Sequence, residues 1–315
     1  MAFTNIVIQV VLLIVGFVLL IKGSDFFVDG ASSVASILKI PSLIVGLTIV
    51  AFGTSAPEAA VSITSSLSGS NALALSNVIG SNLFNMLLII GLCAILSELK
   101  ISKKVLSLDL PFLVILTGIL TAFILIGWNI SRVEGIILLI LIIAYIAYLI
   151  YNAQKSKESQ IVEKPKISPL KSIMYIVCGI AGIIIGADFV VDSASYIAMA
   201  FGMSETLVGL TIVAMGTSLP ELATSLTALK KGENQLVIGN VIGSNIFNIS
   251  FVLGASSAIS PIAINPNMQT DIILMLGVTI LFFIFGKTQD KYDKKEGLIL
   301  LALFIAYMVF AILRN

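Results

Sequence analysis

Residues 46–91 read GLTIVAFGTSAPEAAVSITSSLSGSNALALSNVIGSNLFNMLLIIG, and residues 209–254 read GLTIVAMGTSLPELATSLTALKKGENQLVIGNVIGSNIFNISFVLG. Aligned without a gap at an offset of 163 residues, the two stretches are identical at 26 of 46 positions. Polar positions match at GTS, PE and NVIGSN, and most differences replace one apolar residue by another. Each copy places one glutamate, Glu58 or Glu221, among threonine, serine, asparagine and glycine. The duplicated motif therefore offers many hard oxygen ligands and neither an imidazole nor a thiolate.

The composition around this repeat is that of a polytopic membrane protein. The chain is 58% hydrophobic and 11% charged, with a mean hydropathy of +1.11, which is too apolar for a soluble globule of 315 residues. It has no histidine, which removes imidazole-based proton relays and most transition-metal sites. Apolar runs of about 20 residues can cross a bilayer. We expect ten such spans, at 5–33, 41–67, 71–97, 104–127, 134–152, 169–198, 205–229, 235–259, 268–286 and 297–313.

The distribution of basic residues predicts the orientation of these spans. If the N-terminus lies outside, the loops after spans 1, 3, 5, 7 and 9 are cytoplasmic and contain 15 of the 18 basic residues. Only Arg132 and Arg314 fall on the outer side, and Lys22 lies within the first span. The positive-inside rule therefore predicts that the N-terminus and the C-terminus are both outside.

The repeat extends upstream and divides the chain into two halves. Residues 21–46 pair with residues 184–209 at the same offset, so each half contains five helices. An odd number of crossings separates equivalent points, and the second half therefore enters the membrane in the opposite sense. We predict an all-α fold of two inverted-topology repeats, 1–152 and 169–315, joined by a short cytoplasmic linker, 153–168. Many secondary transporters have such repeats and bind substrate where the two copies meet.

The GTS and PE positions predict a polar face on an interrupted helix. Thr54 and Ser55 precede Glu58 by four and three residues, so all three oxygens face one side. Pro57 lacks an N–H and crowds the preceding turn, which leaves a carbonyl without its helical donor. In hydrocarbon that carbonyl needs another partner, and a bound cation is one candidate. The second copy repeats the arrangement at Thr217, Ser218, Pro220 and Glu221.

The following helix of each copy carries a polar stripe at four-residue spacing. The stripes contain Asn77, Ser81 and Asn85 in the first copy and Asn240, Ser244 and Asn248 in the second. These side chains are candidate ion ligands, and hydrogen bonding between helices is the alternative interpretation. Asn82 and Asn245 point about 100° away from the stripes, and we expect them to bond neighbouring helices together.

The charge of the two glutamates points to a cation. An ionisable group inside the bilayer costs about 3 kcal/mol or more and marks function by default. No lysine or arginine lies within two helical turns of Glu58 or Glu221 in sequence. One divalent or two monovalent ions balance the pair, and calcium suits the mixed oxygens better than magnesium does. The alternative is a protonated carboxyl bonded across helices. Asp25, Asp29, Asp188 and Asp192 either attract cations or serve hydration and helix packing.

GTSAPE and GTSLPE, each followed by NVIGSN and a phenylalanine-asparagine pair, resemble the two alpha-repeats of the cation/calcium exchanger superfamily, and sodium/calcium exchangers most closely. The resemblance covers the whole chain. It implies that calcium leaves the cell as sodium enters, by alternating access, with four cation sites around the glutamates and with helices 1 and 6 sliding over the core. The ligands that it implies are side-chain or backbone oxygens of Ala51, Thr54, Ser55, Glu58, Ser81 and Asn85, and of Ala214, Thr217, Ser218, Glu221, Ser244 and Asn248.

Departures from other branches of the superfamily narrow the expected coupling ion. Proton/calcium members carry GN-A-x-E where this chain has GTS-x-PE. Potassium-dependent members, like some prokaryotic relatives, carry an aspartate at the position of Asn248. We therefore expect a sodium/calcium antiporter of the cell membrane, with proton- or potassium-coupled exchange and, less favoured, a cation channel as alternatives. We expect no enzymatic activity, no cofactor and no nucleic-acid partner. The expected partners are calcium, sodium and the lipid bilayer, and the expected functional unit is a monomer.

Overall fold

The computed structural model describes residues 2–69, 71–156, 167–203, 208, 212, 214–264 and 266–314, and these residues are largely helical. The first half contains α1 (Ala2–Leu38), α2 (Ser42–Val45), η1 (Gly46–Val50), α3 (Ala51–Thr54), α4 (Ala56–Leu67), α5 (Asn71–Leu83), η2 (Phe84–Ile89), α6 (Ile90–Leu96), η3 (Val105–Asp109), α7 (Leu110–Gly127) and α8 (Arg132–Ser156). The second half contains α9 (Pro169–Ala200), α11 (Ala214–Gly216), α12 (Leu219–Lys230), α13 (Asn234–Phe247), η5 (Asn248–Val252), α14 (Leu253–Ile259), α15 (Pro266–Gln289) and α16 (Lys294–Arg314).

These helices confirm the all-α, multi-span architecture. Among the described residues, eight helices are long and apolar enough to cross a membrane, and the pair Ser42–Thr54 and Ala56–Leu67, bent by 49° at its break, makes a ninth when it is counted as one span. The expected span 205–229 corresponds to α11 and α12, and its upstream part lies largely outside the described residues. The expected linker 153–168 likewise lies mostly outside them, between the end of α8 and the start of α9.

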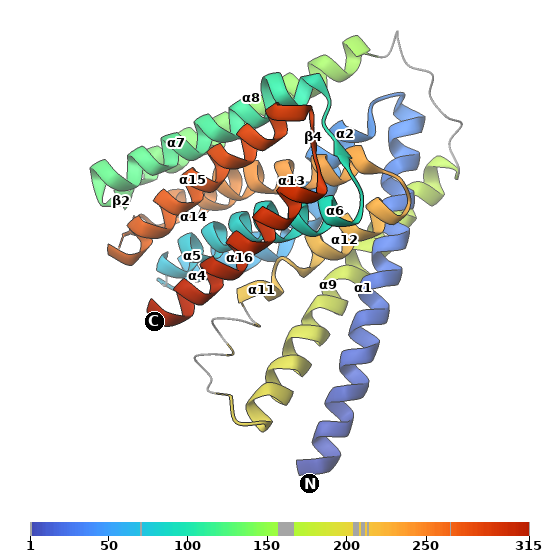
Figure 1. Cartoon of the computed structure of the whole chain (residues 1–315), viewed down its shortest axis with the longest axis vertical. Helices are drawn as coiled ribbons and strands as arrows, with labels where there is room; N and C mark the ends of the chain where they lie inside the picture. The colour runs from blue at the N-terminus through green and yellow to red at the C-terminus, as the bar shows by residue number, and fades with distance from the viewer. Residues whose placement is uncertain are drawn as a thin grey trace.

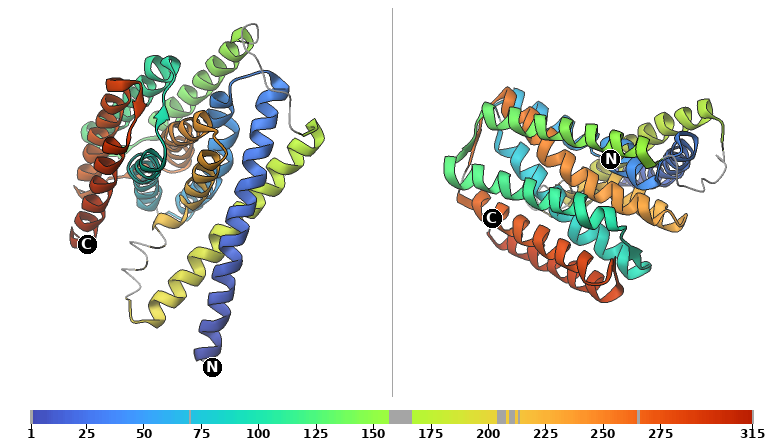
Figure 2. Two further views of the ribbon diagram at one scale, coloured as in Figure 1. Left: turned by 45° about the vertical axis from the view of Figure 1, so that its right-hand side comes forward. Right: turned by 90° about the horizontal axis from the view of Figure 1, so that it is seen from above.

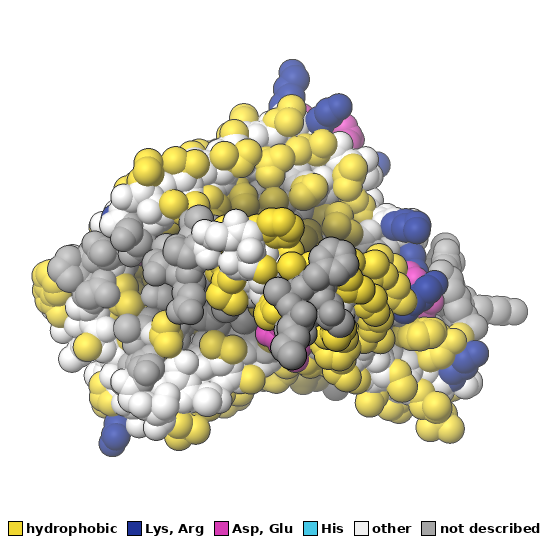
Figure 3. Space-filling view, turned by 90° about the horizontal axis from the view of Figure 1, so that it is seen from below, with side chains coloured by type: hydrophobic (Ala, Val, Ile, Leu, Met, Phe, Trp, Pro, Cys, Tyr) yellow, Lys and Arg dark blue, Asp and Glu magenta, His cyan; other side chains and the backbone are white. Residues whose placement is uncertain are grey.

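Burial separates a central pair of spans from an outer ring. In the most apolar stretch of the α13–α14 span, 94% of residues are buried, against 17% in α16. The span that begins with α5 is 78% buried by the same measure. Seen from below, hydrophobic side chains cover much of the described surface and basic side chains lie at its edges (Figure 3). The duplicated motifs are therefore central, and the outer helices present apolar side chains to lipid.

Two short strand pairs show that the halves are inverted. β1 (Leu99–Lys100) pairs with β4 (Lys291–Tyr292), and β2 (Asn129–Ile130) pairs with β3 (Ile262–Ala263). At the repeat offset of 163 residues, β1 coincides with β3, and β2 coincides with β4 to within one residue. The 23 helical residues between β1 and β2 span about 34 Å at 1.5 Å per residue, so the two strand pairs lie at opposite ends of the bundle. Equivalent strands thus lie at opposite ends of the spans, as an inverted repeat requires.

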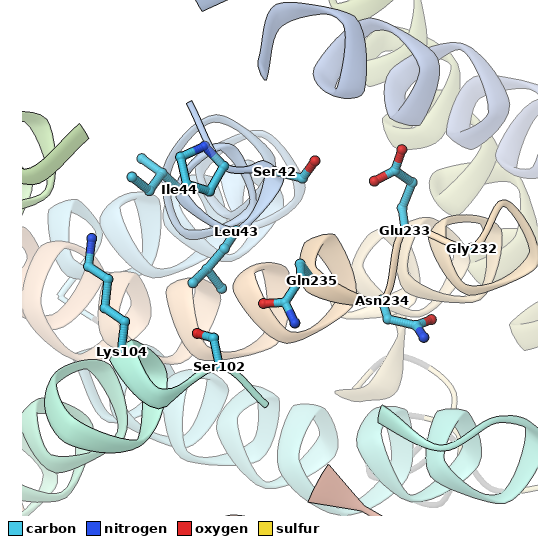
Figure 4. A pocket seen from close by; sticks show the side chains of 10 residues that line it. Ser42, Leu43, Ile44, Ser102, Lys104, Gly232, Glu233, Asn234 and Gln235 are labelled. Carbon is cyan, nitrogen blue, oxygen red and sulfur yellow. The ribbon is translucent and has the colours of Figure 1, made fainter. Parts of the chain in front are cut away.

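A cavity of about 530 Å³ shows that three odd-numbered connections share one end of the bundle (Figure 4). It is lined by residues 41–44 after the first span, by Ser102 and Lys104 after the third, and by residues 232–235 after the seventh. This is the arrangement that alternating spans produce. None of the candidate ion ligands lines this cavity.

α1 and α9 form a pair that lies to one side of the other helices. Both extend beyond the rest of the bundle, as Figure 1 and the left view of Figure 2 show. Their backbones touch through glycines: a Cβ atom added to Gly179 would lie 2.7 Å from Phe27 N, and one added to Gly186 would lie 2.7 Å from Leu20 N. Small residues allow such close approach where a bilayer supplies no hydrophobic driving force between helices.

An ion pair attaches α1 to the core at one end. Lys231 Nζ lies 2.9 Å from Asp29 Oδ1 and 3.5 Å from Asp25 Oδ1, so these two aspartates serve helix packing. Their equivalents in α9, Asp188 and Asp192, are exposed, and no basic partner for them occurs in the part of the chain that the structure describes.

Two glycine substitutions should have opposite effects on stability, because only one of the two glycines lies in the contact between α1 and α9. In Gly179→Ala, the new methyl group meets the backbone of Phe27, which cannot move aside, and we expect a loss of about 1–3 kcal/mol in stability. In the control Gly118→Ala, on α7, the methyl group meets no atom within 4 Å, and higher helix propensity should stabilise by up to about 1 kcal/mol. Melting temperatures of the detergent-purified proteins measure both effects. Equal shifts in the two variants would contradict this packing.

Candidate functional site

The two serines of the GTS motifs lie at the break in each interrupted helix. Ser55 separates α3 from α4 with φ −83° and ψ 10°, and Ser218 precedes α12 with φ −92° and ψ 4°. A serine followed three residues later by glutamate ordinarily forms a capping box within one helix. In this structure neither serine makes a side-chain capping bond to its own helix. Both hydroxyls are therefore available for another partner.

That partner is the glutamate of the opposite repeat. Ser55 Oγ donates to Glu221 Oε1 at 2.7 Å, and Ser218 Oγ donates to Glu58 Oε1 at 3.1 Å. Serines of the polar stripes contact the same oxygens from within each repeat: Ser81 Oγ lies 3.4 Å from Glu58 Oε1, and Ser244 Oγ lies 3.4 Å from Glu221 Oε1. Both glutamates are 0% exposed. The two carboxylates are thus held by hydroxyls from both halves of the chain.

A second pair of bonds across the repeats involves the threonines. Thr54 Oγ1 donates to Asn240 Oδ1 at 3.1 Å, and Thr217 Oγ1 donates to Asn77 Oδ1 at 3.2 Å. Each asparagine also donates through Nδ2 to the main-chain carbonyl of its own glutamate, at 3.3 Å for Asn77 with Glu58 and at 3.4 Å for Asn240. Asn77 and Asn240 therefore link the break of one repeat to the glutamate of the other, and the inter-helix interpretation holds for these two members of the stripes.

The last asparagine of each stripe lies where the helix changes its pitch. Asn85 belongs to the π-helical turn η2, and Asn248 begins the equivalent turn η5. Single π-helical turns inside α-helices occur frequently at functional sites. Asn85 Nδ2 donates to Asn245 Oδ1 at 3.1 Å, and Asn248 Nδ2 donates to Asn82 Oδ1 at 3.2 Å. Asn82 and Asn245 thus bond helices together, as the sequence predicts.

Four acceptor oxygens in this cluster have no donor. Among the described residues, Glu58 Oε2, Glu221 Oε2, Asn85 Oδ1 and Asn248 Oδ1 are buried and lack a hydrogen-bond partner. Buried polar atoms are nearly always bonded, so each exception requires an explanation. All four atoms only accept hydrogen bonds or coordinate cations, and each repeat contributes one carboxylate and one amide oxygen. The unmet requirement is therefore for positive charge.

The protein supplies little of that charge itself. Glu58 and Glu221 lie in the first turns of α4 and α12, where the positive end of the helix dipole faces a carboxylate. In the described part of the chain, the ion pairs are elsewhere, and no lysine or arginine contacts either glutamate. Two buried carboxylates without a counter-ion are costly, and a bound metal ion removes that cost.

The donor set fits a hard cation rather than a transition metal. No group of three or more His, Cys, Asp or Glu side chains that could hold a metal occurs among the described residues. Carboxylate, amide and hydroxyl oxygens are the ligands that calcium takes in flexible geometry, with six to eight oxygens at about 2.3–2.6 Å. Sodium shares the preference for hard oxygen ligands. The cluster is chemically suited to both ions.

The structure brings most of the sequence candidates into this cluster. Ten of the twelve are buried: Ala51, Thr54, Ser55, Glu58, Ser81, Asn85, Ser218, Glu221, Ser244 and Asn248. Thr217 is partly buried and reaches the cluster through Asn77. The Ala51 carbonyl accepts the Ser55 N–H at 3.0 Å, and it also accepts from Thr54 Oγ1 at 3.4 Å. Ala214 begins α11, and its side chain lies outside the described residues.

The position of Lys231 is a contact that the sequence alone does not predict. Its pairing with Asp25 and Asp29 joins residues about two hundred positions apart. The sequence shows two consecutive lysines, Lys230 and Lys231, before a turn and two aspartates at i, i+4 spacing, and neither pattern identifies the other as its partner.

Comparisons with known proteins concern the chain as a whole. Residues 8–151 and 171–313 match the family described as sodium/calcium exchanger protein. The chain is 37% identical to the putative antiporter CaxA of Alkalimonas amylolytica, over 94% of this chain and 96% of that protein. It is 30% identical to the sodium/calcium exchanger MaX1 of Methanosarcina acetivorans, over 96% of this chain and 98% of that one. A solved structure of the sodium-calcium exchanger NCX_Mj, soaked with sodium and strontium, superposes with a TM-score of 0.86 at 30% identity, covering 96% and 99% of the two chains.

The bonds of Asn240 predict the effect of removing its amide. Asn240→Leu keeps the number of side-chain heavy atoms but leaves the buried Thr54 and Ser225 hydroxyls without this partner, and we expect a loss of about 1–3 kcal/mol in stability. The control Thr121→Val removes a buried hydroxyl that bonds only a carbonyl of its own helix, and it should be nearly neutral. Thermal unfolding in detergent measures both. An Asn240→Leu protein as stable as Thr121→Val would show that the bridge between repeats has no energetic role.

Proposed function

We propose that this chain, which belongs to the sodium/calcium exchanger protein family, moves calcium across the membrane in exchange for sodium by alternating access. Members of this family are transporters and not enzymes, and they carry sodium and calcium ions without a cofactor. The chain is a multi-pass membrane protein of the same architecture. Which ions the chain couples, and how, depends on its own residues.

The four unpartnered acceptor oxygens carry the proposal. Glu58 Oε2, Glu221 Oε2, Asn85 Oδ1 and Asn248 Oδ1 are buried at the junction of the repeats, and two of them carry negative charge. The serine hydroxyls that bond the Oε1 atoms are already close enough to serve as further ligands. We assign direct coordination to these side chains and a backbone contribution to Ala51 and Ala214.

The charge of the pocket explains why two different ions exchange. Two carboxylates carry two negative charges, which one calcium ion or two sodium ions neutralise. One calcium ion or two sodium ions would remove the repulsion between the carboxylates and give the unpartnered oxygens a partner, so calcium and sodium compete for the same oxygens. Additional sodium ions bound by neutral oxygens would add to this core. Mutually exclusive occupancy of one site is the physical basis of exchange.

Alternating access requires a moving element, and the α1–α9 pair is the candidate. These two helices contact each other through glycine backbones and pack against the interrupted helices: a Cβ on Gly53 would lie 2.9 Å from Phe27 Cζ, and one on Gly216 would lie 2.4 Å from Val191 Cγ2. Movement of the pair along the core would uncover first one break and then the other. The central α5 and α13 helices would stay in place.

The orientation of the chain and its working unit belong to the same proposal. The basic residues of the odd-numbered connections support a cytoplasmic location for those loops, with both termini outside. The units are the repeats 1–152 and 169–315 with the linker 153–168, in the cell membrane. Because both repeats of one chain complete the cluster, we assign transport to the monomer.

A flux assay tests the coupling ion. Proteoliposomes loaded with sodium and diluted into sodium-free calcium should accumulate calcium while an ionophore collapses the pH gradient, with potassium absent on both sides. Uptake should disappear when internal sodium is replaced by choline. Uptake that needs a pH gradient and ignores sodium would instead establish proton coupling, and uptake that needs potassium would establish the potassium-dependent alternative.

Matched substitutions tie this flux to the cluster. Glu58→Gln and Glu221→Gln each remove one charge, and we expect calcium uptake to fall to background in both while the proteins remain folded. Glu98→Gln is the control, because Glu98 is exposed and pairs with Lys291 away from the site. Full uptake in both cluster variants would overturn the assignment. Discrete current steps in a planar bilayer would identify a channel instead.

A further inference from the structure

Two asparagines that are not among the proposed ion ligands contact the ligands of the opposite repeat. Asn82 in α5 and Asn245 in α13 are 1% and 0% exposed, and within the described part of the chain their side-chain hydrogen bonds go to the opposite repeat. Each follows a stripe serine directly and precedes the stripe asparagine by three residues. They therefore project from the same helix as the ligands, but toward the other half of the chain.

Their contacts are reciprocal. Asn85 Nδ2 donates to Asn245 Oδ1 at 3.1 Å, and Asn248 Nδ2 donates to Asn82 Oδ1 at 3.2 Å. Asn82 Nδ2 lies 3.4 Å from the main-chain oxygen of Asn245, which ties the two central helices together at the same level. Each stripe asparagine is thus held by its nitrogen, and its oxygen remains without a donor. The two contacts differ in one respect: Asn82 Nδ2 donates to the Asn245 carbonyl, whereas Asn245 Nδ2 has no hydrogen-bond partner.

The chemistry of a primary amide makes this contact decisive for ion binding. The amide group is planar, with an oxygen that can coordinate a cation and an NH₂ group that cannot. A half-turn of the terminal torsion exchanges the two at almost no change in shape. An acceptor placed at the nitrogen favours one orientation, and the oxygen then faces the opposite way. In this structure, the Oδ1 atoms of Asn85 and Asn248 are buried without a donor, as are the Oε2 atoms of the two glutamates.

We propose that Asn82 and Asn245 are positioning residues that hold the Asn248 and Asn85 amides with Oδ1 toward the transported cation. This inference rests on the proposed function and adds to it a contact that each repeat makes on behalf of the other. Without Asn245 Oδ1, the Asn85 amide turns freely and presents NH₂ hydrogens to a cation for part of the time. The same relation holds for Asn82 and Asn248.

Calcium binding to the purified full-length chain tests the proposal. Asn245→Leu should weaken the calcium affinity by about tenfold or more, as loss of an outer-shell partner commonly does. Asn245→Asp keeps an acceptor oxygen for Asn85 Nδ2 and should not weaken it. Thr279→Val is the control, because Thr279 is buried but bonds only the Met275 carbonyl of its own helix, and it should bind calcium as the unaltered chain does.

A double-mutant cycle separates positioning from general support of the fold. If Asn245 acts through Asn85, Asn245→Leu should cause no further loss of affinity in an Asn85→Ala background. Equal losses in both backgrounds would show a structural role and overturn the proposal, as would unchanged affinity in Asn245→Leu. If Asn245→Leu does not fold, the equivalent cycle of Asn82→Leu with Asn248→Ala decides. Absence of calcium binding by the unaltered chain would overturn the proposed function as well. If the unaltered chain binds calcium, the variants test the positioning role of Asn82 and Asn245 alone.

Discussion

Two buried carboxylates with no basic side chain beside them are the constraint on which the rest of the structure depends. Glu58 and Glu221 are removed from solvent, and only hydroxyl groups contact them in the described part of the chain. Hydroxyl bonds and helix dipoles reduce the cost of this burial but do not neutralise two charges. The breaks at Ser55 and Ser218, the π-helical turns and the amide stripes all bring further oxygens to the same place. They form a cluster of oxygens that, in the function we propose, bound cations complete.

The bonds around this pocket cross from one repeat to the other. Each glutamate depends on the serine of the opposite break, and each threonine depends on the asparagine of the opposite stripe. Neither half could assemble the cluster by itself. Duplication with inversion therefore does more than double the number of polar side chains, because it supplies the same contact from both membrane sides, as the proposed alternating access requires.

The sequence predicts much of this arrangement, for identifiable reasons. Apolar length locates the spans, the odd number of helices in a repeat requires inversion, and i, i+3, i+4 spacing shows that Thr54, Ser55 and Glu58 share a face. Periodicity does not give the angle between helices, so it cannot choose partners about 160 residues apart. It could not show that Ser55 bonds Glu221, and it could not connect Lys231 with Asp25 and Asp29. Those choices are made by tertiary packing.

Long-wavelength anomalous diffraction from crystals equilibrated with calcium tests the central claim most directly. We expect an anomalous peak between the two carboxylates, at about 2.3–2.6 Å from Glu58 Oε2 and Glu221 Oε2, the usual calcium–oxygen distance. A peak elsewhere, with the two carboxyl groups apart or each bonded to a protein donor, would contradict it.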